Sequence, residues 1–377
     1  MSHDRRLDQT AIIGEGLIDR LAAILRDRDL SPSRAAIVID PALSHGPIGQ
    51  RVTGALGPAA PAFRVAPGEP TAGDIDRLAL WLRTTDPEVV IAVGGGSVLD
   101  AAKLATAITD AADDRPNSAA YACGATPLPT RRRALIAVPT TAGTGSEATR
   151  TTVYALSSGA KVWAWGDRIG FDAAILDPIV TIGLPPPLTA MTGADAIVHA
   201  IESLTNRRED ADAVRFAEAS LKLAGQHLVP AVLDGANLPA RAGMLEAAYW
   251  AGRAIDLTGC AMAHGLGHAL GTVLKMPHGR AVALSLAAIL PVNVRAAPDA
   301  HAGAARALNL GADLPVAFDG LLDQIGFAEL PPIAADDAHR SAVIASLMAP
   351  ENQPMCDVNA APLSAFDLPA VTRAVLP

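Results

Sequence analysis

Five side chains that can bind a metal ion lie in one stretch of the second half of the chain. Asp195 and His199 are four residues apart, and so are His264 and His268, while His278 follows ten residues later. Residues four apart share one face of a helix, so each pair can direct both side chains toward the same point. The spacing therefore predicts that two helices and a loop carrying His278 meet around one ion.

These side chains offer imidazole nitrogens and a carboxylate, a donor set that suits Fe(II) or Zn(II). The set includes no thiolate, whereas structural zinc sites usually contain cysteine. A divalent ion held in this way acts as a Lewis acid on a carbonyl or alcohol oxygen. The alternative is a group of ordinary helix histidines without an ion, which the paired spacing disfavours. We interpret Cys260, close to the second pair in the sequence, as a small buried apolar side chain.

His268 lies one helical turn from His264 and is the candidate for moving a proton, because the ordinary pKa of histidine lies near neutrality. A second interpretation is that His268 only orients a metal ligand, and the sequence leaves both open. His227 has no partner at helical spacing, so we interpret it as an ordinary helix residue.

Composition narrows the class of protein. The chain has 377 residues, which is enough for two domains, and only 3% of them are aromatic. Its formal net charge is −9. With no basic stretch to offset phosphate charge, nucleic acid and an anionic membrane are unsuitable partners, and a small-molecule substrate is expected.

The cysteines and the apolar runs predict a soluble, cytoplasmic protein. Three widely spaced cysteines give no disulfide framework, which fits a reducing compartment. The first ten residues contain no apolar leader segment. The longest uncharged apolar run, residues 281–292, is too short to cross a bilayer and predicts a buried core helix.

The first half of the chain alternates short β-branched runs with stretches rich in Ala and Leu. Continuous apolar strands separated by helices predict a parallel sheet covered on both faces. The runs that predict strands are residues 35–40, 89–93 and 134–138.

Helical periodicity replaces these runs after Pro185-Pro186-Pro187, for instance over residues 211–228 and 240–255. We predict loops between helices over residues 313–332. A proline run at such a change marks a domain boundary. The sequence thus predicts an α/β domain over residues 1–184 and an all-helical domain over residues 185–377.

A glycine-rich turn, Gly94-Gly95-Gly96-Ser97, follows the apolar run at 89–93 and precedes a helical stretch. Backbone N–H groups at a helix N-terminus form an anion site, and glycines let a diphosphate approach the main chain. The turn is not the G-x-G-x-x-G fingerprint of ordinary dinucleotide-binding domains. Taken alone it is either a structural turn or a phosphate cradle.

A second turn, residues 139–147, ends the run at 134–138 with small hydroxyl residues that can bind a ribose or an amide. Two such turns at strand ends predict one dinucleotide crevice. Asp40 ends another strand, where a carboxylate can bind ribose hydroxyls and repel a ribose phosphate. We therefore favour NAD(H) over NADP(H), although Asp40 can instead simply begin the turn before Pro41.

Four segments, in this order and spacing, resemble the iron-containing (group III) alcohol dehydrogenases: GGGSVLDAAK, VPTTAGTGSEAT, GADAIVHAIES and HGLGHALG…MPHG. The similarity extends from Ala35 to Asn359. The resemblance implies a Rossmann-like parallel-sheet domain followed by an all-α domain, an architecture shared with dehydroquinate synthase. It also implies an NAD-dependent alcohol dehydrogenase with Fe2+, or alternatively Zn2+, as its metal.

Residue by residue, the resemblance assigns the metal ligands to Asp195, His199, His264 and His278. His268 matches a histidine near the nicotinamide, and we take His268 and Asp100 as the catalytic candidates. The positions that match the cofactor site are Asp40, Gly95, Gly96, Ser97, Asp100, Thr140, Thr141, Ser146 and Lys161.

The substrate pocket departs from the common family pattern, because Ile255, Asp256 and Leu257 stand where an aromatic, a serine and an asparagine are frequent. Arg150 matches a position near the substrate that usually carries a smaller neutral side chain. An arginine there can bind a carboxylate, phosphonate or sulfonate through its two-pronged guanidinium. Arg150 and Ile255 are therefore the substrate-binding candidates, although Arg150 can instead face solvent or pair with an acid such as Glu147.

These observations predict a metal-dependent, NAD(H)-linked alcohol dehydrogenase or aldehyde reductase, with a small anionic aldehyde as the hypothesised substrate. One rival is maleylacetate reductase, to which Leu270-Gly271 is similar but which often lacks the aspartate ligand. Another is a lyase like dehydroquinate synthase, which needs more lysines and arginines around a phosphate. Family members are commonly dimers or larger, so a homo-oligomer is expected.

Overall fold

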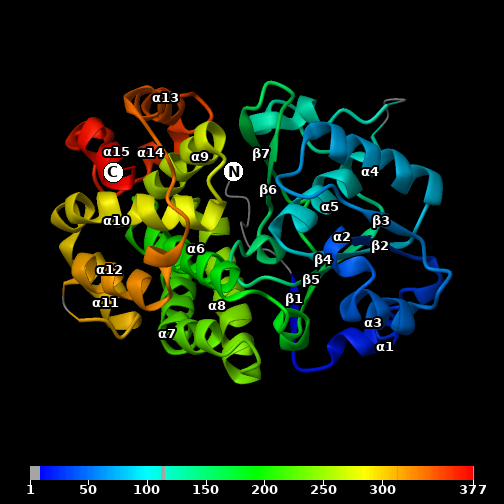
Figure 1. The fold of residues 1–377 in the computed structure, drawn as a ribbon. Helices are drawn as coiled ribbons and strands as arrows, with labels where there is room; N and C mark the ends of the chain where they lie inside the picture. Colours follow the sequence, from blue (N-terminus) through cyan, green and yellow to red (C-terminus); the bar gives the residue numbers. More distant parts are fainter. Residues whose placement is uncertain (1–8, 112–114, 312, 377) are drawn as a thin grey trace. The chain divides into compact units, whose positions relative to one another are not determined.

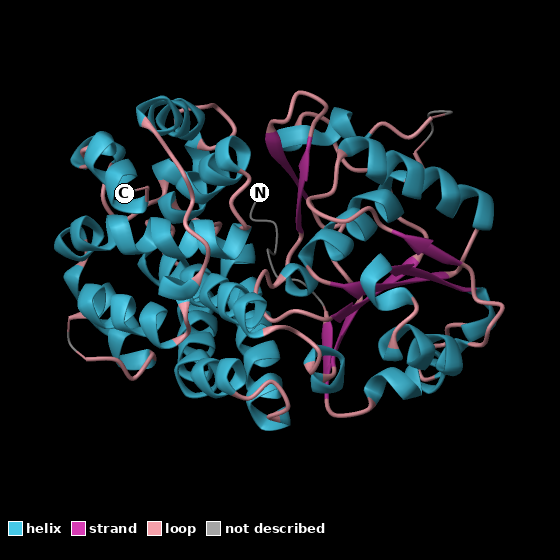
Figure 2. Cartoon of the chain, viewed as in Figure 1, coloured by secondary structure: helices cyan, strands magenta, loops and turns pink. Residues whose placement is uncertain are grey.

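The computed structural model describes residues 9–111, 115–311 and 313–376. The chain divides into two compact units. The sheet unit comprises residues up to Thr141 together with Ser146–Ile182, and the helical unit comprises Ala142–Gly145 together with Gly183 onward. Strands lie in the first of these units, and the second is built from helices and loops (Figure 2). The predicted fold class, a parallel-sheet domain followed by a helical one, is confirmed.

Six parallel strands form the main sheet of the sheet unit, in the order β1-β8-β5-β4-β2-β3 (Figure 1). The strands predicted from apolar runs are its centre, β2, β4 and β5, and every residue of β2 and β4 is buried. The edge strands are short and partly exposed, so the sequence signals them weakly. The strands are β1 (Thr10–Ile13), β2 (Ala35–Ile39), β3 (Ala62–Arg64), β4 (Val89–Gly94), β5 (Ala134–Pro139) and β8 (Ala173–Leu176), with a separate antiparallel hairpin of β6 (Thr151–Ala155) and β7 (Lys161–Trp165).

Helices cover the sheet. On one face, alternate strand residues such as Ile37 and Ile91 pack against Leu21 and Leu25. The intervening strand residues are buried as well, and α5 contacts β4 and β5. The helices of this unit are η1 (Leu17–Arg20), α1 (Leu21–Arg26), η2 (Pro32–Arg34), α2 (Pro41–Ser44), α3 (Pro47–Leu56), α4 (Ala72–Thr85), α5 (Gly96–Ile108), η3 (Ser118–Gly124), η4 (Ser146–Ala148) and η5 (Pro178–Thr181).

The helical unit packs its longest helices closely because small residues lie where they meet. A Cβ on Gly193 would lie 2.2 Å from Leu228, and one on Gly243 would lie 2.1 Å from the ring of His227. The two predicted helical stretches are confirmed as α7 and α8. The helices are α6 (Pro186–Thr205), α7 (Ala211–Leu233), α8 (Leu238–Thr258), α9 (Met262–Leu274), α10 (His278–Ala296), α11 (Pro298–Ala307), α12 (Leu314–Gln324), η6 (Phe327–Glu329), α13 (Asp337–Leu347), α14 (Gln353–Asp357), η7 (Leu363–Ala365) and α15 (Leu368–Val375).

Two predictions from the sequence, a buried core helix and a set of loops, concern segments of this unit. Helix α10 contains the run at 281–292 and, by length and composition, is apolar enough to cross a membrane. It contacts α6 and α9 and contributes Val282, Leu286 and Ile289 to the core, so it is the buried core helix that was predicted. The prediction of loops over residues 313–332 is wrong in part, because α12 occupies Leu314–Gln324 and is capped by the side chain of Asp313.

Candidate functional site

Three helices of the helical unit carry the predicted metal ligands. Helix α6 carries Asp195 and His199, and α9 carries His264 and His268. His278 was predicted to lie in a loop, and this is wrong: it is the first residue of α10, directly after Pro277 at the N-cap. Pro277 has a non-helical backbone, with ψ at 134°, so the helix begins at the histidine.

The side chains of Asp195, His264 and His278 meet in the helical unit. Asp195 Oδ1 lies 3.4 Å from Nε2 of His264 and 3.7 Å from Nε2 of His278. One ligand atom from each of these residues lies within 4.8 Å of the others, which is close enough for a shared ion. The centroid of the His268 ring lies 5.7 Å from the centroid of the His278 ring.

His199 belongs to a second, overlapping group. Its Nδ1 lies 3.8 Å from Asp195 Oδ1, and its ring stacks on the ring of His264 with 4.3 Å between centroids. One ligand atom each from His199, Cys260 and His264 lies within 4.8 Å of the others. The sequence predicted a donor set without a thiolate, and the structure places the thiol of Cys260 beside two of the predicted ligands. Cys260 was interpreted from the sequence as a small buried apolar side chain, and its position four residues before His264 is the signal that could have suggested this proximity.

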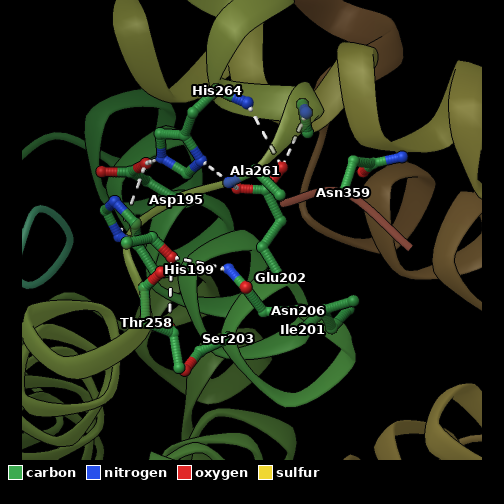
Figure 3. A network of polar contacts seen from close by, with 12 residues as sticks. Asp195, His199, Ile201, Glu202, Ser203, Asn206, Thr258, Ala261, His264 and Asn359 are labelled. Carbon is green, nitrogen blue, oxygen red and sulfur yellow. Dashed lines mark hydrogen bonds and ion pairs between the residues drawn. The ribbon is translucent and has the colours of Figure 1, made fainter. Parts of the chain in front are cut away.

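Glu202 is the residue that holds the His264 side chain in place, and the sequence analysis missed it. It lies on α6, seven residues after Asp195 and so on the same side of the helix. Its carboxylate accepts hydrogen bonds from the backbone N–H of Ala261 at 2.8 Å and Ala263 at 2.6 Å, and it lies 2.6 Å from Nδ1 of His264 (Figure 3). With Nδ1 engaged by Glu202, Nε2 of His264 is left for an ion.

Helix α9 has no side-chain cap of its own, so the Glu202 carboxylate also replaces the missing N-cap. A buried anion at this position is favoured by the N-terminal end of the helix dipole. The sequence signal for this role is the spacing of Asp195, His199 and Glu202 along one helix face.

The charges of this cluster are strongly coupled. Burial opposes ionisation of Asp195, but the nearby His199, His278 and His264 hold its pKa well below the usual range. Burial lowers the pKa of His199 to about 4. Burial acts in the same sense on His264, yet the carboxylates of Glu202 and Asp195 raise its pKa to about 9. The cluster is therefore built around negative charge that attracts a cation.

The buried polar atoms of the cluster fit a metal ion. Oδ1 of Asp195, Nδ1 of His199 and Nε2 of His264 are buried and make no hydrogen bond to the residues that the structure describes. Buried polar atoms in native proteins are nearly always satisfied. A divalent cation bonded to imidazole nitrogen and carboxylate oxygen satisfies these atoms.

In the sheet unit, the predicted cofactor residues gather at the carboxyl ends of neighbouring strands. Strand β4 pairs with β2 and β5, so Asp40, Gly95 and Thr140 follow adjacent strand ends. Strands β2 and β4 are neighbours in the sheet. From β2 the chain continues to β3 on one side of this pair, and from β4 it continues to β5 on the other side. Ligands of open α/β sheets bind where the strand order reverses in this way.

The turn Gly94-Gly95-Gly96 leads directly into α5, which has no side-chain cap. Its first backbone N–H groups therefore remain available to an anion. A Cβ on Gly95 would lie 3.2 Å from Oγ1 of Thr141, and one on Gly94 would lie 2.6 Å from Val98. A Cβ at either position would thus crowd a neighbouring side chain, and its absence leaves the backbone open to a diphosphate.

The other predicted cofactor residues have partners inside the sheet unit. Asp40 accepts a hydrogen bond from the backbone N–H of Ala42 and caps α2, while Lys161 forms a 2.8 Å ion pair with Glu69. Asp100 accepts hydrogen bonds from Ser146 Oγ and from the backbone N–H of Val153 at 3.0 Å. Burial raises the pKa of Asp100.

The two substrate-binding candidates lie in different units. Arg150 is 2% exposed, forms a 2.8 Å ion pair with Asp167 and stacks over the ring of Trp165. The acid that pairs with Arg150 is thus Asp167 rather than Glu147. Ile255 is half-buried in the last turn of α8, just before the loop that carries Cys260.

Comparison with known proteins covers both units. Residues 8–178 match the family described as iron-containing alcohol dehydrogenase, and residues 189–318 match the C-terminal domain of the same family. A probable alcohol dehydrogenase, EutG, of Salmonella typhimurium is 39% identical over 60% of this chain and 57% of that protein. The chain thus aligns with less than two thirds of that relative's own length.

Two further proteins align over more of their length. A phosphonoacetaldehyde reductase of Streptomyces viridochromogenes is 32% identical over 75% of this chain and 73% of that protein. The crystal structure of a sulfoacetaldehyde reductase from Bifidobacterium kashiwanohense, in complex with NAD+, superposes with a TM-score of 0.87 at 26% identity. That superposition covers 99% of this chain and 98% of the other.

Proposed function

Because the chain belongs to the iron-containing alcohol dehydrogenase family, we propose that it is a divalent-metal-dependent, NAD(H)-linked dehydrogenase that interconverts a small primary alcohol and its aldehyde. The observation that carries the proposal is the group formed by the buried Asp195 and His264 with the partly buried His278, whose ligand atoms lie within 4.8 Å of one another. The family description supports Fe2+ as the metal. The NAD+ complex of the Bifidobacterium enzyme and the position of Asp40 support NAD(H).

We assign the metal to Asp195, His199, His264 and His278. When bound, the ion polarises the substrate oxygen as a Lewis acid, and the nicotinamide ring gives or takes the hydride. Asp195 supplies the negative charge that draws in the cation, and Glu202 keeps Nε2 of His264 free for it. His268 remains the candidate for moving the alcohol proton.

For the substrate we propose an aldehyde that carries an anionic group. Two of the relatives are named for phosphonoacetaldehyde and sulfoacetaldehyde, both small anionic aldehydes. Arg150 supplies a buried cation in the sheet unit, although its guanidinium is already paired with Asp167. A homo-oligomeric assembly stays a prediction.

The first test is NADH oxidation by protein loaded anaerobically with Fe(II) or Zn(II). Butanal, succinate semialdehyde, phosphonoacetaldehyde, sulfoacetaldehyde and maleylacetate are compared side by side. We expect turnover of an anionic aldehyde that is lost on chelation and restored by metal. Turnover of maleylacetate alone would favour the rival reductase, and the absence of NADH oxidation with every carbonyl would favour the lyase.

The variant Arg150→Ala tests separately whether Arg150 binds the anionic group of the substrate. If Arg150 binds the anionic group, the variant raises the KM for the anionic aldehyde far more than the KM for butanal. Asp167→Asn is the matched control, since it removes the ion-pair partner and leaves the guanidinium. An equal change for both aldehydes in Arg150→Ala would show that the arginine only supports the fold.

A further inference from the structure

The loop between α8 and α9 places a thiol beside two of the proposed metal ligands. One ligand atom each from Cys260, His199 and His264 lies within 4.8 Å of the others. Nδ1 of His264 is engaged by Glu202, so Nε2 is the atom that His264 can offer to this group. The same Nε2 lies 3.4 Å from Asp195 in the other group, so the two groups overlap at His264.

Hydrogen bonds on both sides fix the position of Cys260. The backbone N–H of Ala261 donates to Glu202, and the carbonyl of Gly259 accepts a hydrogen bond from Asn206 at 3.2 Å. One residue earlier, the hydroxyl of Thr258 lies 2.9 Å from that of Ser203 (Figure 3). Every one of these anchors comes from α6 or from the residue that ends it, so the helix that carries His199 also positions the thiol.

The two histidines of this group are buried and have nitrogen atoms that lack a hydrogen-bond partner among the described residues. His199 and His264 are 4% and 2% exposed, and Nδ1 of His199 and Nε2 of His264 make no hydrogen bond to any described residue. Leaving such atoms unsatisfied is costly in a buried site. A cation bonded to Nδ1 of His199 and Nε2 of His264, in the plane of each ring, satisfies both nitrogens, and the sulfur of Cys260 lies within 4.8 Å of one ligand atom of each histidine.

We propose that Cys260, His199 and His264 form a second, softer metal position that takes a thiophilic divalent cation such as Zn2+ or Co2+ through the cysteine thiolate. Thiolate and imidazole suit these ions, whereas a position with the carboxylate of Asp195 suits Fe2+ better. On binding, a metal–sulfur bond replaces the S–H bond and the proton leaves to solvent, with no change of oxidation state. Because His199 and His264 are also proposed as ligands of the first position, the two positions compete for both histidines. The inference rests on the proposed function, since it assumes that these histidines bind a divalent ion.

Anaerobic titration of the full-length apoprotein with Co2+ tests the proposal spectroscopically. Cobalt bound to nitrogen and oxygen shows ligand-field bands in the visible range, and a thiolate ligand adds a charge-transfer band in the near ultraviolet. We expect both in the wild-type protein. Cys260→Ser should lose the near-ultraviolet band and keep the visible bands.

The chain has three cysteines, so the control is direct. The double variant Cys123→Ser/Cys356→Ser retains Cys260 alone and should keep the near-ultraviolet band, which also covers the case in which Cys260→Ser fails to fold. Visible bands without the near-ultraviolet band in the wild-type protein would overturn the role of Cys260 and leave the proposed metal site standing. The absence of both would overturn the metal site itself.

Discussion

The sheet unit and the helical unit use different chemical groups for their candidate sites. In the sheet unit, the groups available to a ligand are backbone amides at the start of α5, and glycines keep side chains away from them. In the helical unit, the groups available to a ligand are buried side-chain atoms held in place by other side chains. The comparison indicates that the first site depends on the space above the main chain, while the second depends on individual donor atoms.

Two buried glutamates show the same difference. Glu202 in the helical unit accepts backbone hydrogen bonds from Ala261 and Ala263 and meets the ring of His264. Glu147 in the sheet unit is 1% exposed, and its Oε1 makes no hydrogen bond to a residue that the structure describes. Burial raises the pKa of Glu147 to about 7, with Asp100 adding to the effect. Glu202 thus has a defined partner set, and Glu147 is a carboxyl group whose ionisation the fold opposes.

Removing a metal ligand should produce the largest effect. His264→Ala deletes the nitrogen shared by both ligand groups, so we expect loss of bound metal and a fall in kcat of about a thousandfold or more. Metal analysis of the purified protein and steady-state kinetics measure both. NADH binding, followed by fluorescence, should remain, because the sheet unit is untouched. His227→Ala is the control, and equal losses in the two variants would contradict the assignment.

Glu202→Gln should have the next largest effect. The amide keeps an oxygen for the backbone N–H groups but removes the charge beside His264, so metal affinity should fall by about 10- to 100-fold. Competition with a metal chelator measures the affinity. Glu218→Gln, on the exposed side of α7, is the matched control. Unchanged affinity in Glu202→Gln would show that Glu202 only caps α9.

Glu147→Gln should change how stability depends on pH. The folded protein holds the proton of Glu147 up to about pH 7, whereas the unfolded chain releases it near the ordinary value of 4.5. This contribution to stability is complete below the unfolded pKa and is lost as the pH rises through 7. The Glu147→Gln variant should therefore lose on the order of 1 to 3 kcal/mol less of its free energy of unfolding than the wild type between pH 5 and pH 8.

Urea denaturation at several pH values measures this change. The control is Glu15→Gln, an exposed residue of the sheet unit, which should leave the profile as it is. A Glu147→Gln variant whose stability declines with pH as steeply as the wild type would assign the effect to other groups.

Gly95→Ala should give the smallest effect and should act on the cofactor alone. The new Cβ would crowd Thr141 and the space above the amides of α5, so the KM for NADH should rise about tenfold. Metal content should stay constant, which is the opposite of the result for His264→Ala. Gly54→Ala, whose Cβ would meet no atom within 4 Å, is the control. A loss of metal in Gly95→Ala would break the distinction between the two sites.

Much of the fold was predictable because its signals are local. The central strands are continuous apolar runs, since both of their faces are covered, and the helical periodicity of α7 and α8 is long and regular. The edge strands β1 and β3 are short, and α12 lies in a stretch rich in Ala and Pro, so local patterns were weak there. The hairpin of β6 and β7 depends on pairing that no single segment reveals.

The sequence by itself determined which residues share a helix face, because the pitch of the helix places Asp195, His199 and Glu202 on one side of α6. It also showed the glycine-rich turn before α5, because the glycines directly follow a continuous apolar run that predicts a strand. The tertiary structure alone decided that Glu202 meets the start of α9 and that Cys260 lies beside His199. Those contacts join segments about sixty residues apart in the chain, and packing between helices, rather than any local preference, brings such segments together.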